Sequence, residues 1–159
     1  MASFQSTLLD RIALRGSAAP ELSFGEYREM VLRDLNWLFN TMNAEIAGVL
    51  ADDSEETWKG SVLNYGIPSL CGQVSRDLSP RNIEKMFEQA IRRFEPRIFS
   101  RGLRVHCRQS ESEVGNESLQ VSIEAELWAQ PSAERVYLQS EIDLETGAVR
   151  VSDAAGKRS

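Results

Sequence analysis

The chain has 159 residues, of which 42% are hydrophobic and 26% are charged, and its formal net charge is −6. This length and composition are typical of one soluble globular domain, and no apolar run approaches the roughly 20 residues that span a bilayer. The first residues have neither the apolar core nor the cleavage site of a signal peptide, so we expect a cytoplasmic protein without membrane insertion. The two cysteines, Cys71 and Cys107, are too few for a disulfide framework and are expected to be free thiols.

Residues 1–20 are predicted to form an N-terminal arm. Apolar side chains recur at helical spacing between Phe4 and Leu14, and the sequence GSAAP then separates this segment from the rest of the chain. A short amphipathic segment cannot bury its own apolar face. It must therefore pack either on the core of the domain or on a partner, and the sequence leaves both alternatives open.

The clearest helix is predicted for residues 23–43. Ser23 is suited to the N-cap, and Glu26, three residues later, completes a capping box. Apolar residues recur at steps of three and four, so they form one helix face that is expected to pack on the core, while Arg28, Arg33 and Asp34 are expected in solvent. The residues of the apolar face are Tyr27, Val31, Leu35, Leu38 and Met42. The apolar residues 44–51 either continue this helix or begin another, before an acidic turn at residues 52–56.

A second helix is predicted after an irregular segment. Residues 61–72 are expected to form a short extended piece and then a turn, in which Gly66 can take a positive φ. Ser79 is suited to cap the next helix, and Pro80 occupies its first position. Pro96 keeps Glu95 out of helical geometry, so this helix ends near Phe94. Its predicted buried face consists of Ile83, Phe87, Ala90, Ile91 and Phe94.

After Gly102 the hydrophobic period changes to two, which indicates β-strands. Alternation covers residues 103–108, 119–129 and 136–144, a polar loop is expected at residues 109–118, and residues 148–151 add a last short strand. Helices followed by a strand meander predict an α+β fold, with helices packed on one face of a small, mainly antiparallel sheet in the C-terminal half. We expect one domain over residues 21–151 and a disordered tail over residues 152–159.

Positive charge is concentrated in one segment. Residues 92–108 hold six arginines and the only histidine against one carboxylate, Glu95, so this segment carries +5 and the rest of the chain −11. The asymmetry indicates an oriented surface, and the acidic remainder argues against nucleic-acid binding. Arginines can bind a partner's carboxylates through paired hydrogen bonds, and the edge of a strand meander can accept a partner's strand. Trp128, on an outer strand face, is either an interface anchor or is covered by a neighbouring loop.

Glu95 has three possible roles: a catalytic acid, part of a docking surface, or only the end of a helix. Glycoside hydrolysis needs a second, well-placed carboxylate, and none is visible, while nearby arginines favour the ionised form of Glu95. His106 stands alone and the cysteines are not spaced to join it, so no metal site is expected. Glycine motifs that bind phosphate are absent. We therefore expect an interaction protein with no cofactor and no small-molecule substrate.

Five segments of the chain, taken in order, resemble a known family. The sequence FEPRIF, residues 94–99, contains a Glu-Pro-Arg motif, and it is accompanied by LLDRI, VLRDLNWLFNT, SVLNYGIPSLCG and IDLETGAVRV. This ordered set is similar to the lysozyme-like baseplate wedge family of contractile phage tails and type VI secretion systems, and most similar to its type VI secretion member. The resemblance spans most of the chain.

The resemblance implies a structural subunit, not an enzyme, that docks to other baseplate wedge subunits and starts assembly of the contractile sheath. Sheath subunits exchange strands in such systems, so the subunit is expected to offer the first strand-pairing surface. The implied partner-binding residues are Glu95, Pro96, Arg97, Arg101 and Arg104, with Asn64, Tyr65 and Gly66 as a second matched element. Replacing Glu95 or Arg97 by alanine is predicted to leave the monomer folded and to weaken sheath docking. Two alternatives stay open: a peptidoglycan-cleaving enzyme that uses Glu95, and a soluble regulatory adaptor of similar fold.

Overall fold

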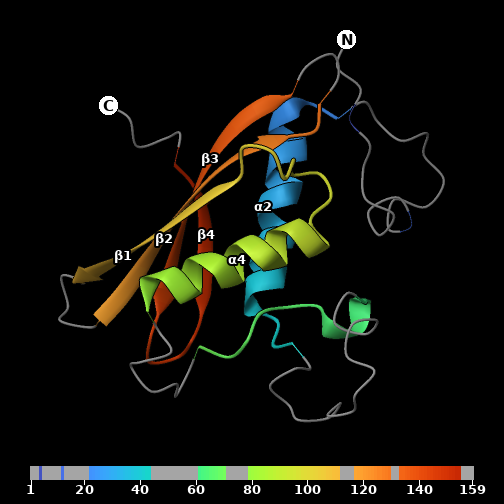
Figure 1. The fold of residues 1–159 in the computed structure, drawn as a ribbon. Coiled ribbons are helices and arrows are strands. Elements are labelled where there is room, and N and C mark those ends of the chain that lie inside the picture. The colour runs from blue at the N-terminus through green and yellow to red at the C-terminus, as the bar shows by residue number, and fades with distance from the viewer. Residues whose placement is uncertain are drawn as a thin grey trace.

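The computed structural model of the chain describes residues 4, 12, 22–43, 61–70, 79–111, 117–129 and 133–154. These residues contain two long helices, α2 (Phe24–Asn40) and α4 (Pro80–Phe94), and a short 3-10 helix, η1 (Val62–Asn64). Four strands follow, namely β1 (Arg104–Glu111), β2 (Glu117–Leu127), β3 (Glu134–Asp143) and β4 (Val149–Asp153) (Figure 1). The predicted α+β fold, with helices before a strand meander, is confirmed.

Helix α2 begins where its capping box predicts. The Ser23 hydroxyl accepts a hydrogen bond from the Glu26 N–H, and the Glu26 carboxylate accepts one from the Ser23 N–H at 2.8 Å. The predicted apolar face is buried, with one exception: Met42 is 61% exposed. The prediction for Met42 is wrong because the helix ends at Asn40 and the chain continues in extended form. Phe39, which the helical periodicity did not select, is buried in the core instead.

Helix α4 matches its prediction in both ends and in its buried face. The Ser79 hydroxyl accepts the N–H of Asn82, Pro80 occupies the first position, and the last helical residue is Phe94. Four of the five expected core residues are buried, and Phe94 is half-buried. The preceding segment differs from expectation, because Val62 to Asn64 form a 3-10 turn instead of an extended piece. Residues 44–60 and 71–78, which include the predicted continuation of α2 and Cys71, lie outside the described residues.

The four strands form one antiparallel sheet in the order β1-β2-β3-β4. Strand β1 continues to Glu111 and β2 starts at Glu117, so residues 109–111 and 117–118 of the predicted loop are strand. The alternation that predicted the strands is confirmed by burial: Val121, Ile123 and Ala125 of β2 lie in the core. Strand β4 runs to Asp153, two residues into the predicted tail.

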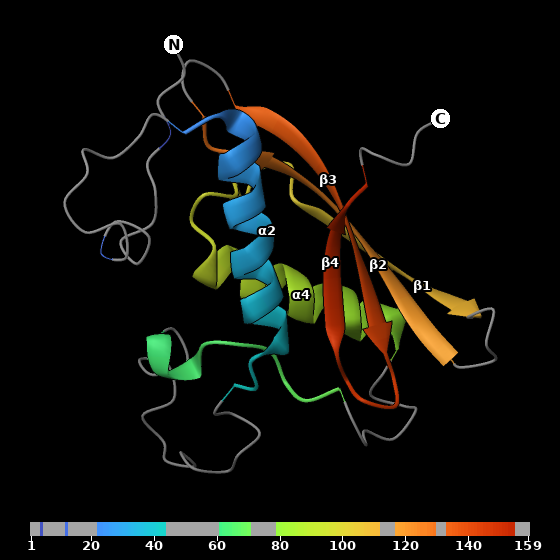
Figure 2. The ribbon, with the colours of Figure 1, turned by 180° about the vertical axis from the view of Figure 1, so that it is seen from behind.

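The helices and the sheet form two layers with the core between them. Helix α4 crosses one face of the sheet and packs on β1, while α2 packs beside β4 (Figures 1 and 2). Of the N-terminal arm, Phe4 is buried and stacks on Tyr27 with ring centroids 4.9 Å apart, so this residue packs on the domain itself. Ile12, by contrast, is 66% exposed. No helix within the described part of the chain is long and apolar enough to cross a membrane.

Candidate interaction site

The Glu-Pro-Arg motif forms a tight corner between α4 and the sheet. The Glu95 N–H donates to Ile91 in the last turn of α4, and the Glu95 carbonyl accepts the N–H of Ile98 at 3.1 Å. Beyond the corner the chain runs antiparallel to the end of β2, where Arg97 accepts the N–H of Trp128 at 2.7 Å. The corner therefore lies on the same side of β2 as β1. It is found at the end of the sheet where β1 begins.

Glu95 and Arg97 form an ion pair in the interior of this corner. Glu95 is 4% exposed. Its carboxylate accepts the Arg97 side chain through Nε at 2.7 Å and Nη2 at 2.5 Å, and also the Arg97 main-chain N–H at 3.2 Å. Such two-point binding of a carboxylate by a guanidinium group fixes direction as well as distance.

The same guanidinium group reaches Asp34 on α2. Arg97 Nη2 lies 2.6 Å from Asp34 Oδ2, and both side chains are 17% exposed. Burial alone would lower the pKa of Arg97, but hydrogen bonds and charge attraction from Glu95, and then from Asp34, raise it above its ordinary value. Arg97 therefore stays charged and links the end of α4 to α2. The sequence prediction that Asp34 lies in solvent is wrong, because its side chain is only 17% exposed and its Oδ2 atom accepts this bond.

The other two side chains predicted to be solvated also make contacts. Arg28 pairs with Asp153 of β4. Arg33 pairs with its neighbour Asp34 at 2.9 Å, and its guanidinium group lies 4.9 Å from the centre of the Trp37 ring. Trp37 is 51% exposed and lines a groove of about 370 Å³ above the Glu-Pro-Arg corner.

The second matched element, Asn64 to Gly66, lies against the same corner. The Tyr65 ring packs edge-on against Phe94, with centroids 5.3 Å apart. Gly66 has φ of 118°, and a Cβ atom there would lie 2.1 Å from the carbonyl oxygen of Thr41, so glycine is required both by the backbone angle and by space. The positive φ predicted for Gly66 is confirmed. Asn64 is buried, which the sequence pattern did not predict.

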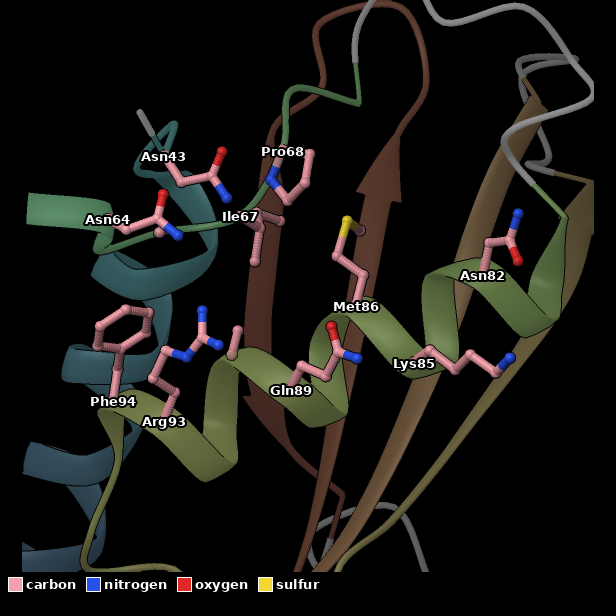
Figure 3. A pocket seen from close by; sticks show the side chains of 12 residues that line it. Asn43, Asn64, Ile67, Pro68, Asn82, Lys85, Met86, Gln89, Arg93 and Phe94 are labelled. Atoms are coloured by element: carbon pink, nitrogen blue, oxygen red, sulfur yellow. The ribbon is translucent and has the colours of Figure 1, made fainter. Parts of the chain in front are cut away.

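A pocket of about 380 Å³ lies between this element and α4. Figure 3 shows Asn43, Asn64 and Pro68 on one side and Gln89 and Arg93 along the helix on the other. The Asn43 side chain is buried, and its carbonyl oxygen has no hydrogen-bond partner among the described residues. The lining mixes amide, cationic and apolar groups.

The two edges of the sheet differ in how their main-chain groups are satisfied. On β4, Asn40 accepts the N–H of Val149 at 3.0 Å and donates to its carbonyl at 2.6 Å. Asn36, one turn earlier on α2, does the same for Val151 at 2.9 and 3.3 Å. Each amide side chain thus bonds as a neighbouring strand would, and we call this pair the asparagine clamp. It occupies the outward main-chain groups of β4 at Val149 and Val151.

The β1 edge is closed at one position only, as far as the described residues extend. The Cys107 N–H donates to the Glu84 carboxylate of α4 at 2.9 Å, which shows that Cys107 points its main chain away from β2. Because main-chain bonding alternates along an antiparallel strand, Val105 and Gln109 face outward in the same way. No described residue forms a hydrogen bond with the outward main-chain groups of Val105 or Gln109. Among the described residues, β1 is therefore the sheet edge with fewer occupied main-chain groups.

The structure brings some of the predicted site residues together and leaves others apart. Glu95, Pro96, Arg97 and Tyr65 share one corner. Arg101 and Arg104 are exposed, and neither forms an ion pair within the described ranges. Sequence reasoning missed Asp34, Glu84 and the asparagine clamp. The spacing of Asn36 and Asn40, one helical turn apart, is the only local signal for the clamp.

This arrangement does not resemble a hydrolytic site. A general acid must present its carboxyl group to a substrate, whereas the Glu95 carboxylate is buried and already bound by Arg97. The nearest carboxylate in the network, Asp34, is bound by the same guanidinium group. No cluster of three possible metal ligands occurs within the ranges that the structure describes. The geometry instead supports a rigid corner beside an open strand edge.

The family model described as baseplate wedge protein gp25 matches residues 25–132. The chain belongs to this family, which also contains TssE of type VI secretion systems. Searches of curated proteins and of solved structures found no match.

Proposed function

We propose that the chain is the TssE-type wedge subunit of a type VI secretion baseplate and works in the cytoplasm. In this role it docks to other wedge subunits and starts sheath assembly by pairing a sheath strand with β1. Membership of the baseplate wedge family supports the first part. The five ordered segments, LLDRI through IDLETGAVRV, favour the type VI member within that family.

The observation that supports strand pairing at β1 is that the two edge strands differ in how many of their outward main-chain groups are already hydrogen-bonded. Main-chain groups of an edge strand can bond a strand from another molecule. On β4 the outward residues Val149 and Val151 are bonded by the asparagine clamp, whereas on β1 the Cys107 N–H alone is occupied by a described residue. Of the two edges, β1 is the one that can accept a strand without the loss of α2.

The buried corner gives this edge a fixed position. Arg97 joins Glu95 to Asp34, and its main chain bonds to the end of β2. We infer that the corner acts by holding β1 and the end of α4 in register for docking, with Arg101 and Arg104 available at the surface for a partner's carboxylates. Glu95 and Arg97 would then affect docking mainly through the shape of this edge.

A substitution at Gln109 tests the use of the β1 edge. Its N–H points outward, so Gln109→Pro removes a donor that a partner strand needs while the bonds to β2 remain. Gln109→Ala removes the exposed side chain but keeps the N–H and is the matched control. We expect Gln109→Pro to lose recruitment of purified sheath subunits, and Gln109→Ala to retain it.

Circular dichroism and a thermal melt establish that both variants are folded. Co-purification with other wedge subunits should persist in both, because that contact does not require the β1 edge. Sheath recruitment by Gln109→Pro at the level of wild type would contradict strand pairing at β1. A chain that co-purifies with a single soluble partner but with no wedge subunit would instead be an adaptor.

A further inference from the structure

The outer face of β1 is a row of basic side chains. Arg104, His106 and Arg108 alternate along the strand and are all exposed, whereas Val105 and Cys107 point into the core. None of the three basic residues forms a hydrogen bond or an ion pair with any residue that the structure describes. An open strand edge thus carries three basic side chains at intervals of two.

The neighbouring strand compensates this row only in part. In the register of β1 with β2, Arg104 lies opposite Glu124, but His106 lies opposite Ser122 and Arg108 opposite Gln120. At these two positions β2 places no acidic residue opposite the row. A strand that pairs with β1 from the open side places its own outer-face residues directly opposite the same three positions.

The inner face of the edge calls for a different kind of side chain. Val105 and Cys107 are 7% and 8% exposed, and they lie at the border of the core. The Glu84 carboxylate occupies the edge at Cys107 from the helix side. A carboxylate on the inner face of an incoming strand would meet like charge and apolar surface, so that face is expected to be apolar.

We propose that the strand accepted by β1 belongs to another protein and alternates acidic residues on its outer face with apolar residues on its inner face. This inference rests on the proposed pairing at β1 and adds the chemistry of the partner. Arg104 and Arg108 each bind a carboxylate of that strand, and its inner residues extend the apolar row of Val105 and Cys107. The incoming main chain replaces Glu84 at the Cys107 N–H.

The same charges disfavour a second copy of β1 as the occupant. Antiparallel pairing of two β1 edges about His106 places Arg104 of one copy opposite Arg108 of the other, which brings like charges together at both ends. Like charges directly opposite each other destabilise a strand pair, and basic residues on an edge are a common means of preventing self-association. The row therefore selects for an acidic partner strand.

Two synthetic peptides test the proposal with no natural partner present. Both are capped nine-residue peptides; one alternates Glu with Val, and the other alternates Lys with Val. At low salt we expect the Glu/Val peptide to bind the full chain at least about tenfold more tightly, with NMR shifts of the Val105 and Gln109 amides. This preference should shrink at about 0.5 M salt, where charges are strongly screened.

Charge reversal supplies the second arm of the experiment. The double variant Arg104→Glu/Arg108→Glu should reverse the preference between the two peptides. Arg150→Glu is the matched control, because Arg150 is exposed on β4, whose edge is closed by the asparagine clamp. It should behave as wild type.

Equal binding of both peptides to the wild-type chain would overturn the proposal, as would an equal effect of Arg150→Glu. The comparison on wild type decides the matter even if the double variant does not fold. Because no sheath protein is present, this result is independent of the Gln109→Pro experiment. Loss of sheath recruitment with no peptide preference would keep β1 as the docking edge and remove only the acidic pattern.

Discussion

Removal of the Arg97 guanidinium group is expected to destabilise the fold strongly. Arg97→Met keeps most of the aliphatic side chain but leaves the Glu95 carboxylate, which is 4% exposed, without its counter-charge. It also removes the bond to Asp34 that ties α4 to α2. Breaking a buried ion pair by removing one partner typically costs about 3–5 kcal/mol. Because Arg97 and Asp34 are each 17% exposed, we expect the lower end, about 3 kcal/mol.

This cost is a large part of the total stability of a domain, which is about 5–15 kcal/mol. The structure thus changes the expectation drawn from sequence alone, namely that alanine at Glu95 or Arg97 leaves the monomer intact. A docking defect in such a variant is informative only after its stability has been measured. Urea unfolding followed by circular dichroism gives the free energy of unfolding, with a lower midpoint and an unchanged slope expected for Arg97→Met.

Arg92→Met is the matched control for this experiment. Arg92 pairs with Glu88 one helical turn earlier at 2.6 Å, but its side chain is 40% exposed. Exposed pairs of this kind contribute only about 0.3–0.5 kcal/mol. The double variant Glu95→Gln/Arg97→Met should lose less than the sum of its single variants, since it leaves no buried charge at Glu95. A loss for Arg97→Met no larger than that for Arg92→Met would refute the assignment of the corner as a stabilising link.

Three further predictions concern other parts of the structure. Replacing both Asn36 and Asn40 by alanine should cost about 2 kcal/mol in urea unfolding, because four main-chain groups of β4 lose their partners; a change within error would show that water replaces the clamp. Gly66→Ala should cost at least about 2 kcal/mol, since the new Cβ meets the Thr41 carbonyl oxygen, and a thermal melt equal to wild type would contradict this. Burial, and then the charge of Glu84, raise the pKa of Cys107 to about 11, so its thiolate is scarce at pH 8. Alkylation followed by peptide mapping should find Cys107 at least about 100-fold slower in the folded chain than in urea, and equal rates would contradict its burial.

The elements of the fold could be predicted from sequence because their signals are local. Ser23 with Glu26 and Ser79 with Pro80 define helix starts within four residues, and alternation in β2 identifies its buried face. The extension of β1 was missed because an edge strand with polar residues has no alternating pattern beyond Arg108. The helix predicted from periodicity also extended beyond the true end of α2, because the spacing of apolar residues does not show where the last helical hydrogen bond is made.

The internal organisation of the candidate site could not be predicted in the same way. Asp34 and Arg97 are 63 residues apart, and Asn36 and Val151 are 115 apart, so no sequence window contains both partners. The resemblance to a family pointed to Glu95 and Arg97 as a unit. It left open whether they pair with each other, with neighbouring residues or across an interface, because a motif shows which residues occur together but not where their side chains point.

The asparagine clamp gives the sheet a direction. A sheet with two free edge strands can accept a strand from another molecule at each edge, and so can lie in the middle of a continuous row of strands. Here the hydrogen-bonding capacity of the β4 side is used within the molecule by Asn36 and Asn40. While the clamp is intact, a continuous row of strands that includes this sheet therefore ends at β4 and extends only from the β1 side.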